Sequence, residues 1–276
     1  MNFQVLNLHM FRSGGNGDLY IGQRSDTGET VIVKFLREFH LPHSRKAFAR
    51  EIRVLGRRLS GIVPLLAWDT AAARPFYVMP YFKGGSLSKY AGRLTATQLR
   101  AAAAELAHIL ANVHAVNDVH GDFKPDNILL TGQGHLQVAD PLGNGSLVTI
   151  LFSQNRGGTP GYMAPEIPTG SSVSASADVY SYGATLYHLF TGRVPRHGQR
   201  LDQELAASPT ERDICEVISV CCHPDPKARP TMQDVLRLLN HTPWSDILNE
   251  RKQRDNFAMA VAVLALGILF GAAMRR

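Results

Sequence analysis

Hydrophobic and polar positions divide residues 1–245 into a strand-rich part followed by a helix-rich part. Residues 30–35 and 76–81 are β-branched or aromatic runs bounded by turn signals, a pattern typical of strands. Apolar residues recur at helical spacing over residues 44–59, which predicts one helix between these strands. The same segment carries a second, basic stripe that we expect to face solvent or an anionic membrane: Lys46, Arg50, Arg53 and Arg57.

Helical patterns dominate after residue 95. Residues 95–116 form a long amphipathic segment that either Thr95 or Thr97 could cap. Two short strand-like pieces, 128–130 and 136–138, flank a turn and predict a hairpin, and helical patterns return from about residue 178 to residue 239. The pattern predicts an α+β fold of two lobes. The small β-rich N-lobe covers about residues 1–82, and the larger α-helical C-lobe covers about residues 83–245.

The C-terminal end has a different character. Residues 257–274 form a run of 18 residues without an ionisable group, closed by two arginines. This length is at the short end of the range for a membrane span, so we expect a transmembrane helix, with residues 246–256 as a juxtamembrane linker. A buried C-terminal helix is the alternative. Gly267 and Gly271 have the G-x-x-x-G spacing at which two helices can approach closely, which makes a homodimer through the anchor helix a candidate.

Composition excludes several classes of protein. Apolar residues make up 45% and charged residues 19% of the 276 residues, unlike a disordered, collagen-like or disulfide-scaffold chain. The net charge of +6 is spread along the chain and argues against a nucleic-acid partner. Three cysteines make no disulfide framework, and the first residues lack the apolar core of a signal peptide. We therefore expect reduced thiols and a cytosolic N-terminus.

Two features of the strand-rich part are candidates for chemistry. Gly14, Gly15 and Gly17 lie between two strand patterns, where backbone amides without side chains could cover phosphates, although such glycines are more often ordinary turns. Lys34 ends an apolar strand, so its ammonium group needs either an anionic partner or exposure to water. Glu51, in the following helix, is the candidate partner, and a surface ion pair of little worth is the plainer alternative.

Residues 119–130, VHGDFKPDNILL, concentrate chemical groups on a tight loop before a short strand. Asp122 could accept a proton from a hydroxyl group. Asn127 and, after the next strand, Asp140 supply hard oxygen ligands of the kind that Mg²⁺ prefers beside phosphates. An ordinary polar loop would explain any one of these residues or Lys124, but it does not explain all four together.

In their order along the chain, these motifs resemble those of the protein kinase family, in its eukaryotic-like (Hanks-type) Ser/Thr branch. The family's V-A-I-K strand appears as VIVK, and its H-R-D-x-K-x-x-N loop appears as HGDFKPDN. GTPGYMAPE at 158–166 resembles the substrate-binding and A-P-E segment, and DVYSYG at 178–183 resembles D-V-W-S-x-G. Arg229 matches the arginine that pairs with the A-P-E glutamate, here Glu166. The likeness runs from about residue 8 to residue 239.

The resemblance implies ATP and Mg²⁺ as cofactors, with Mn²⁺ able to substitute for the magnesium. Lys34, paired with Glu51, would hold the α- and β-phosphates beneath the glycine loop. Asn127 and Asp140 would bind the metal ion that bridges the phosphates. Met79 would be the gatekeeper residue behind the adenine.

The resemblance also implies the remaining contacts. Pro80 and Phe82 would belong to the hinge that binds adenine through backbone atoms; Pro80 has no N–H, so only its carbonyl can take part. Asp122 would orient the acceptor hydroxyl and take its proton, with Asn127 completing the catalytic loop. Lys124 fits the Ser/Thr pattern, so the expected partner is a protein substrate with a Ser or Thr acceptor.

Four positions depart from the family's pattern. Arg12 stands at the first glycine of the loop, and Gly121 replaces the arginine with which a phosphorylated activation loop normally pairs. We therefore expect activity that does not depend on loop phosphorylation. The D-F-G motif reads Asp140-Pro141-Leu142-Gly143, where proline fixes φ and leucine does not take glycine's positive φ at low cost. A restricted flip of Asp140 is the expected result.

Three functional hypotheses follow from different classes. An active protein Ser/Thr kinase in signalling, tethered by a single-pass anchor with its kinase domain on the cytoplasmic side, retains every residue that touches phosphate, metal or proton. A pseudokinase scaffold is the alternative suggested by the altered D-P-L-G and H-G-D motifs. A small-molecule phosphotransferase of the aminoglycoside-kinase type also carries H-G-D, but it does not account for GTPGYMAPE and DVYSYG.

Overall fold

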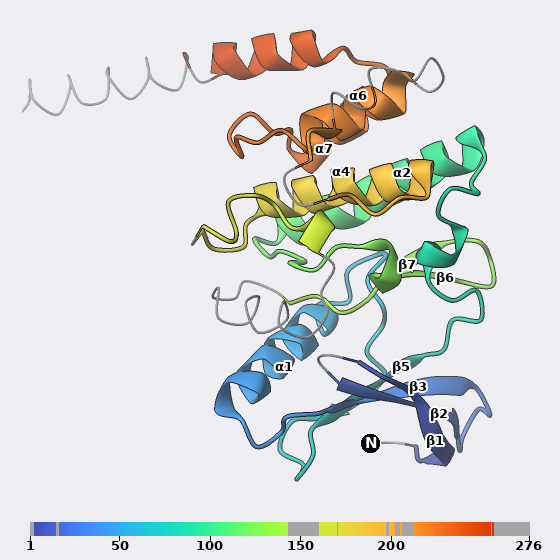
Figure 1. Ribbon diagram of the computed structural model, residues 1–276. Helices are drawn as coiled ribbons and strands as arrows, with labels where there is room; N and C mark the ends of the chain where they lie inside the picture. Colours follow the sequence, from blue (N-terminus) through green and yellow to red (C-terminus); the bar gives the residue numbers. More distant parts are fainter. Residues whose placement is uncertain are drawn as a thin grey trace, which may run out of the picture.

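A five-stranded antiparallel sheet forms the N-lobe of this computed structural model (Figure 1). Its strands lie in the order β1-β2-β3-β5-β4 and span β1 Val5–Ser13, β2 Gly17–Arg24, β3 Thr30–Leu36, β4 Ala67–Asp69 and β5 Phe76–Pro80. The structure describes residues 3–14, 17–142, 160–169, 171–196, 199–201, 205, 212–254 and 256. The register of β3 against β5 places Lys34 directly opposite Tyr77. The two side chains therefore leave the same face of the sheet.

Helix α1 (Pro42–Leu55) packs against this sheet. Its proline lies in the first turn, where a missing N–H is tolerated. Phe48, Ile52 and Leu55 are buried and belong to the same apolar cluster as residues of β3. The helix ends four residues before the predicted Leu59, because the chain leaves the helix at Gly56 and Arg58 adopts a left-handed conformation with φ of 54°.

Part of the basic stripe, at the end of α1 and just after it, is paired with the C-lobe while it stays exposed to solvent. Arg57 Nε lies 3.2 Å and Arg53 Nη2 lies 3.7 Å from the Asp118 carboxylate, whose side chain has no exposed surface. Asp118 precedes the catalytic-loop segment by two residues. These ion pairs therefore link the end of α1 and the residues after it to the C-lobe. Arg53 and Arg57 lie on the exposed face that the sequence predicts, and they have in addition a carboxylate partner in the C-lobe.

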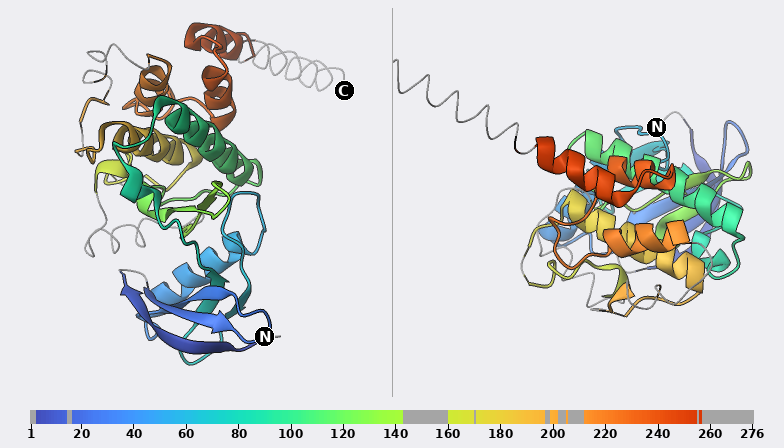
Figure 2. Two further views of the ribbon diagram at one scale, coloured as in Figure 1. Left: turned by 90° about the vertical axis from the view of Figure 1, so that its right-hand side faces the viewer. Right: turned by 90° about the horizontal axis from the view of Figure 1, so that it is seen from above.

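The C-lobe is built mainly of helices around a small hairpin, and it lies at the opposite end of the molecule from the N-terminal sheet (Figure 2). Helix α2 begins after Thr95, which accepts a hydrogen bond from the Gln98 amide while Gln98 accepts one from the Thr95 amide. Thr95 rather than Thr97 is thus the cap. The named elements are η1 Leu87–Tyr90, α2 Ala96–Ala115, η2 Pro125–Asn127, β6 Ile128–Leu130, β7 Leu136–Val138, η3 Pro160–Tyr162, α4 Ala175–Thr191, α6 Arg212–Cys221 and α7 Met232–Leu239.

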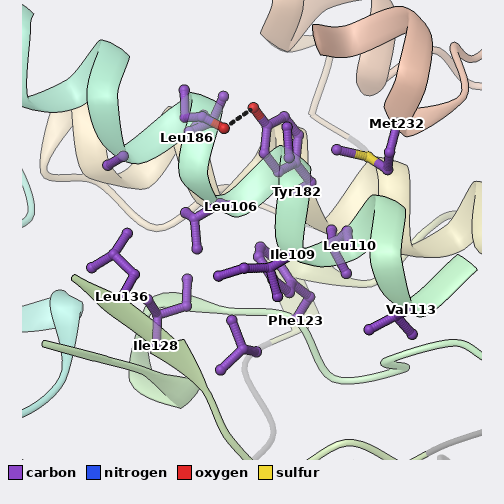
Figure 3. Close-up of a cluster of buried hydrophobic side chains, with 14 of the residues drawn as sticks. Leu106, Ile109, Leu110, Val113, Phe123, Ile128, Leu136, Tyr182, Leu186 and Met232 are labelled. Carbon is purple, nitrogen blue, oxygen red and sulfur yellow. Dashed lines mark hydrogen bonds between the residues drawn. The ribbon is translucent and has the colours of Figure 1, made fainter. Parts of the chain in front are cut away.

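The core of the C-lobe lies between α2, α4 and the hairpin (Figure 3). Leu106 and Leu110 of α2, Leu186 of α4 and Ile128 of β6 belong to one apolar cluster, and all four are fully buried. Tyr182 is buried among them, and its hydroxyl donates a hydrogen bond to the Ala103 carbonyl at 2.9 Å. The hairpin that carries the predicted site is therefore held against the most buried part of the lobe.

The chain after α7 continues as a helix rather than as a loose connection. Residues 244–254 are helical, and Glu250 pairs with Arg237 of α7 at 2.7 Å. Arg251 binds Asp234 and lies over the Trp244 ring. The expected linker, 246–256, is thus attached to the C-lobe over most of its length. Within the described part of the chain, no helix is both long and apolar enough to cross a membrane, and residues 257–274 lie outside that part.

Candidate active site

Lys34 and Glu51 meet in the interior of the N-lobe. Lys34 is 2% exposed and Glu51 is 5% exposed, and their charged atoms are 2.6 Å apart. Lys34 also donates to Asp140 Oδ1 at 3.0 Å, although Asp140 comes from the far end of the β6–β7 hairpin. The pairing of Lys34 with Glu51 is present as the sequence suggests, and it is a buried pair rather than the surface pair of the plainer alternative.

The protonation of this cluster follows from burial and charge. Burial alone would lower the pKa of Lys34, but the carboxylates of Asp140 and Glu51 outweigh it and raise that pKa, so the ammonium is kept. Burial raises the pKa of Glu51 to about 7, against the opposing effect of Lys34. Burial also works against the ionised form of Asp140, but Lys34 holds the pKa of that carboxyl below its ordinary value.

A fourth member of the cluster is Tyr77, to which the sequence motifs assign no role. Its hydroxyl donates to Glu51 Oε1 at 2.6 Å and lies 3.3 Å from Asp140 Oδ1. Burial, together with the two carboxylates, raises the pKa of the phenol well above its ordinary value, so the hydroxyl keeps its proton as a donor. The only signal in the sequence is a polar atom in an otherwise apolar strand.

The glycine loop approaches Lys34 closely. A Cβ atom at Gly17 would lie 2.8 Å from the Phe35 carbonyl oxygen and 3.1 Å from the Lys34 side chain, so only glycine fits there. The amide of Gly14 donates to the Gly17 carbonyl at 3.0 Å and closes the turn. Gly15 lies outside the described residues. Arg12, at the expected first glycine, sits in β1 opposite Leu19.

The catalytic-loop residues form one hydrogen-bonded group. Lys124 Nζ lies 2.9 and 2.8 Å from the two carboxylate oxygens of Asp122. Asn127 donates from Nδ2 to the Asp122 carbonyl at 2.8 Å and to Asp122 Oδ2 at 3.0 Å. The Asp122 carboxylate is therefore fixed from two sides, while about a third of its side-chain surface is exposed.

Two buried residues, His120 and Asp178, hold the backbone of the catalytic loop. Burial lowers the pKa of His120, which favours its neutral form. In that form one tautomer fits both contacts, since Nε2–H donates to the Ala139 carbonyl at 2.9 Å and Nδ1 accepts the Asp122 amide at 3.2 Å. Asp178 of α4 accepts the amides of His120 and Gly121 at 2.7 and 2.8 Å and contacts His114 at 3.0 Å. Asp178 begins the DVYSYG motif, so the signal for it was present in the sequence.

Asn127 and Asp140 lie at adjacent ends of the hairpin, because the Ala139 amide donates to the Asn127 carbonyl at 2.8 Å. Both hydrogen bonds from the Asn127 side chain use its nitrogen, which leaves its oxygen as the atom suited to a metal ion. No group of three or more acidic, His or Cys side chains suited to a metal occurs among the described residues. One carboxylate and one amide oxygen fit Mg²⁺, which keeps waters and binds together with substrate phosphates.

The expected hinge follows β5 directly. Met79 is 6% exposed and stands opposite Ile32 of β3. Pro80 ends the strand opposite Val31. The Phe82 carbonyl accepts the Gly85 amide at 3.0 Å, which fixes the backbone beyond the strand. Met79 and Pro80 thus lie on the strand that pairs with the Lys34 strand, and Phe82 follows it.

In the altered D-P-L-G segment, the strained backbone conformation falls on Asp140, two residues before the leucine. Asp140 itself has φ of 57°, a left-handed conformation that a non-glycine residue adopts at some cost. Leu142 is not among the residues with positive φ in the described part of the chain, so it avoids the strain expected for it. Its amide donates to the His120 carbonyl at 2.7 Å. The segment is therefore bonded to the catalytic loop.

Gly121 and Leu142 fit against each other. Gly121 has φ of 81°, and a Cβ atom there would lie 3.2 Å from Leu142 Cβ and 3.4 Å from a methyl group of Val173. Leu142 and Val173 both pack on the apolar cluster around Tyr162. Apolar packing thus occupies the space beside position 121, where the family carries an arginine.

The end of the activation segment is anchored by an ion pair. Arg229 is 3% exposed and binds Glu166 through two parallel hydrogen bonds of 2.7 and 2.8 Å, the pairing expected from the sequence. Tyr162 contacts His188 Nδ1 at 2.5 Å within the same region. Residues 143–159, including the start of GTPGYMAPE, lie outside the described residues.

Comparison with known proteins identifies the family. Residues 12–244 match the family model described as "Protein kinase domain", and the chain belongs to the protein kinase family. It is 33% identical over 247 residues to "Probable serine/threonine-protein kinase PkwA" of Thermomonospora curvata, a match that covers 83% of this chain and 33% of that protein. The predicted bilobal kinase fold and membership of the Ser/Thr branch are confirmed.

Two further relatives agree with this assignment. The chain is 33% identical over 203 residues to "DNA damage-responsive serine/threonine-protein kinase RqkA" of Deinococcus radiodurans, covering 68% of the chain and 30% of that protein. It is 32% identical over 208 residues to "Serine/threonine-protein kinase Pkn1" of Myxococcus xanthus, a match that covers 70% of this chain and 30% of that protein. The matched part spans about a third of the length of these relatives.

The contact between Gly121 and Leu142 gives a testable prediction. Gly121→Ala should lower both stability and catalytic turnover, because the new Cβ meets Leu142 and disturbs the residue before Asp122. Gly134→Ala is the matched control, since Gly134 has φ of 86° but no atom within 4 Å of the added Cβ. Chemical denaturation should show a loss of about 1–2 kcal/mol for the control from positive φ alone. Equal stability losses with unchanged turnover in both variants would contradict the contact.

Proposed function

We propose that this chain is an active ATP-dependent protein kinase that transfers the γ-phosphoryl group of ATP to Ser and Thr hydroxyl groups of proteins. The observation that carries the proposal is the buried pair of Lys34 and Glu51 in contact with Asp140. This arrangement provides one cation to hold phosphates and one carboxylate to hold a metal ion, which are the main requirements of phosphoryl transfer. The fixed carboxylate of Asp122 adds a site for the acceptor.

Each residue has one task in the proposed reaction. Lys34 holds the α- and β-phosphates, and Asn127 and Asp140 provide the oxygen ligands for Mg²⁺, which neutralises charge on the phosphates when bound. Asp122 accepts a hydrogen bond from the acceptor hydroxyl and takes its proton as the oxygen forms its bond to phosphorus and the bond to ADP breaks. Lys124, next to Asp122, adds positive charge near the transferred group.

A pseudokinase scaffold is the second candidate, because Pro141 and Leu142 alter the metal-binding segment. Two contacts favour the active kinase instead. Asp140 accepts a hydrogen bond from Lys34, and the Leu142 amide is bonded to the catalytic loop, so the altered segment still directs Asp140 to the cluster. A small-molecule phosphotransferase is less favoured, because the Glu166–Arg229 pair and the match over residues 12–244 extend well beyond the catalytic loop.

We also propose that transfer does not require phosphorylation of the activation segment. Gly121 offers no guanidinium to which a phosphate could bind, and Leu142 and Val173 pack beside it. The catalytic loop has internal support instead, because Asp178 accepts the amides of His120 and Gly121. The contacts that hold Asp122 and its loop in place thus come from Asp178, Lys124 and Asn127 of the C-lobe, none of which belongs to the activation segment.

Transfer of labelled phosphate from ATP with Mg²⁺ to a generic protein acceptor tests the proposed function. Asp122→Asn and Lys34→Met should each lower the transfer rate at least about 100-fold, because a proton acceptor and a phosphate-binding cation are lost. Asp246→Asn and Lys46→Met are matched controls on exposed positions and should retain activity. No transfer by the unaltered protein to any acceptor would favour the scaffold, and transfer that survives Asp122→Asn would refute the residue assignment.

We further propose that residues 257–274 anchor the kinase in a membrane as a single span, with the kinase domain on the cytoplasmic side, where ATP is available. The 18-residue run without ionisable groups supports this, as do the basic residues beside it, Arg251, Lys252 and Arg254. The helix over residues 244–254 would then hold the C-lobe close to the bilayer. Gly267 and Gly271 would allow a homodimer of anchors.

Truncation after Asn256 tests the anchor. The shortened chain should stay in the supernatant after ultracentrifugation without detergent, because the apolar run is gone, and it should keep its rate of transfer. The full-length chain should require detergent or lipid vesicles to remain in solution. Equal solubility of both forms without detergent would contradict a membrane span.

A further inference from the structure

Tyr77 occupies a position that the fold fixes from two sides. It is fully buried on β5 and stands opposite Lys34 in the ladder between β3 and β5. Its ring stacks on Phe48 of α1, with centroids 5.4 Å apart and planes at 27°. Both neighbours belong to regular elements, so the location of the hydroxyl is set by the sheet and the helix rather than by a loop.

The hydroxyl and the Lys34 ammonium share the same two acceptors. Tyr77 donates to Glu51 Oε1 at 2.6 Å and lies 3.3 Å from Asp140 Oδ1, and Lys34 contacts these oxygens at 2.6 and 3.0 Å. A phenol has one proton, so it serves one acceptor at a time. The shorter distance assigns that proton to Glu51.

Glu51 needs a hydrogen-bond donor besides Lys34. Lys34 serves two carboxylates here, and under the proposed function it must also serve the phosphates of the nucleotide. The two carboxylates and the α- and β-phosphates make four acceptors, and an ammonium has three N–H donors, so Glu51 benefits from a donor of its own. Glu51 is 5% exposed, so water cannot supply that donor easily, and a buried carboxylate without a partner is strongly disfavoured.

We propose that Tyr77 is a positioning residue that holds the Glu51 carboxylate, so that Lys34 can engage the nucleotide phosphates without leaving Glu51 unpaired. This inference rests on the proposed function, because it concerns the same site. The phenol is neutral, so it adds a donor without competing with Lys34 for the phosphates. The fixed ring brings that donor to Glu51 at little cost in side-chain freedom.

Tyr77→Phe isolates the hydroxyl, since the ring that stacks on Phe48 remains. The dissociation constant for a fluorescent ADP analogue with Mg²⁺ should rise about tenfold, the value of a hydrogen bond to a charged group. Tyr182→Phe is the matched control, because its buried hydroxyl donates only to the Ala103 carbonyl outside the site. Both variants of the full-length chain should lose thermal stability, and only the first should lose nucleotide affinity.

A double-mutant cycle with Glu51→Gln separates positioning from a general loss of packing. In the Glu51→Gln background, Tyr77→Phe should change the dissociation constant by less than about twofold, because the charge that the hydroxyl serves is gone. Unchanged affinity in Tyr77→Phe, or the same loss with and without Glu51→Gln, would overturn the inference. Nucleotide binding is measured without phosphoryl transfer. A chain that binds as predicted but transfers nothing would therefore refute the proposed kinase activity and leave the role of Tyr77 intact.

Discussion

A buried lysine is the constraint on which the rest of the site depends. Lys34 has almost no contact with water, and an ammonium in that position is tolerated only when carboxylates surround it. Glu51 comes from α1 and Asp140 from the hairpin of the other lobe, so one charged group requires three separate elements to meet. Removal of one partner from a buried pair typically costs about 3–5 kcal/mol. The positions of the sheet, the helix and the hairpin are therefore coupled.

The C-lobe has a corresponding buried acid in Asp178. It accepts two successive amides of the catalytic loop, and the neutral His120 links the same loop to the chain before Asp140. Asp118, contacted by Arg57 just after α1, joins this region to the end of the helix that carries Glu51. Asp118, His120 and Asp178 thus connect the end of α1 and the chain before Asp140 to the catalytic loop. Such an arrangement favours a site that is assembled before substrate arrives.

The parts of the site that depend on residue order could be predicted from the sequence. Lys34 with Glu51, and Glu166 with Arg229, were expected as pairs because the motifs occur in family order, and both contacts are present. The hairpin and the start of α2 also followed from local patterns, since turn and capping residues act over a few positions. What the pattern did not predict was which of two threonines caps α2, because either satisfies the local rule.

The features that depend on long-range register could not be predicted. Tyr77 reads as an ordinary strand residue until β3 and β5 are aligned and Lys34 is found opposite it. The sequence places Arg57 on an exposed basic stripe but does not show that the C-lobe brings the Asp118 carboxylate beside it. The strain in the altered D-P-L-G segment was expected at Leu142, but the positive φ falls on Asp140, because the bond from the Leu142 amide to His120 fixes the chain after it.

Under the proposed function, these contacts assemble the catalytic centre without a phosphorylated activation segment. The most direct measurement is the early time course of phosphoryl transfer by protein that has been fully dephosphorylated with a phosphatase, which is then removed. Transfer to the acceptor should begin without a lag and at the same rate as for protein incubated beforehand with ATP. A lag that shortens at higher protein concentration, and disappears after incubation with ATP, would contradict the claim.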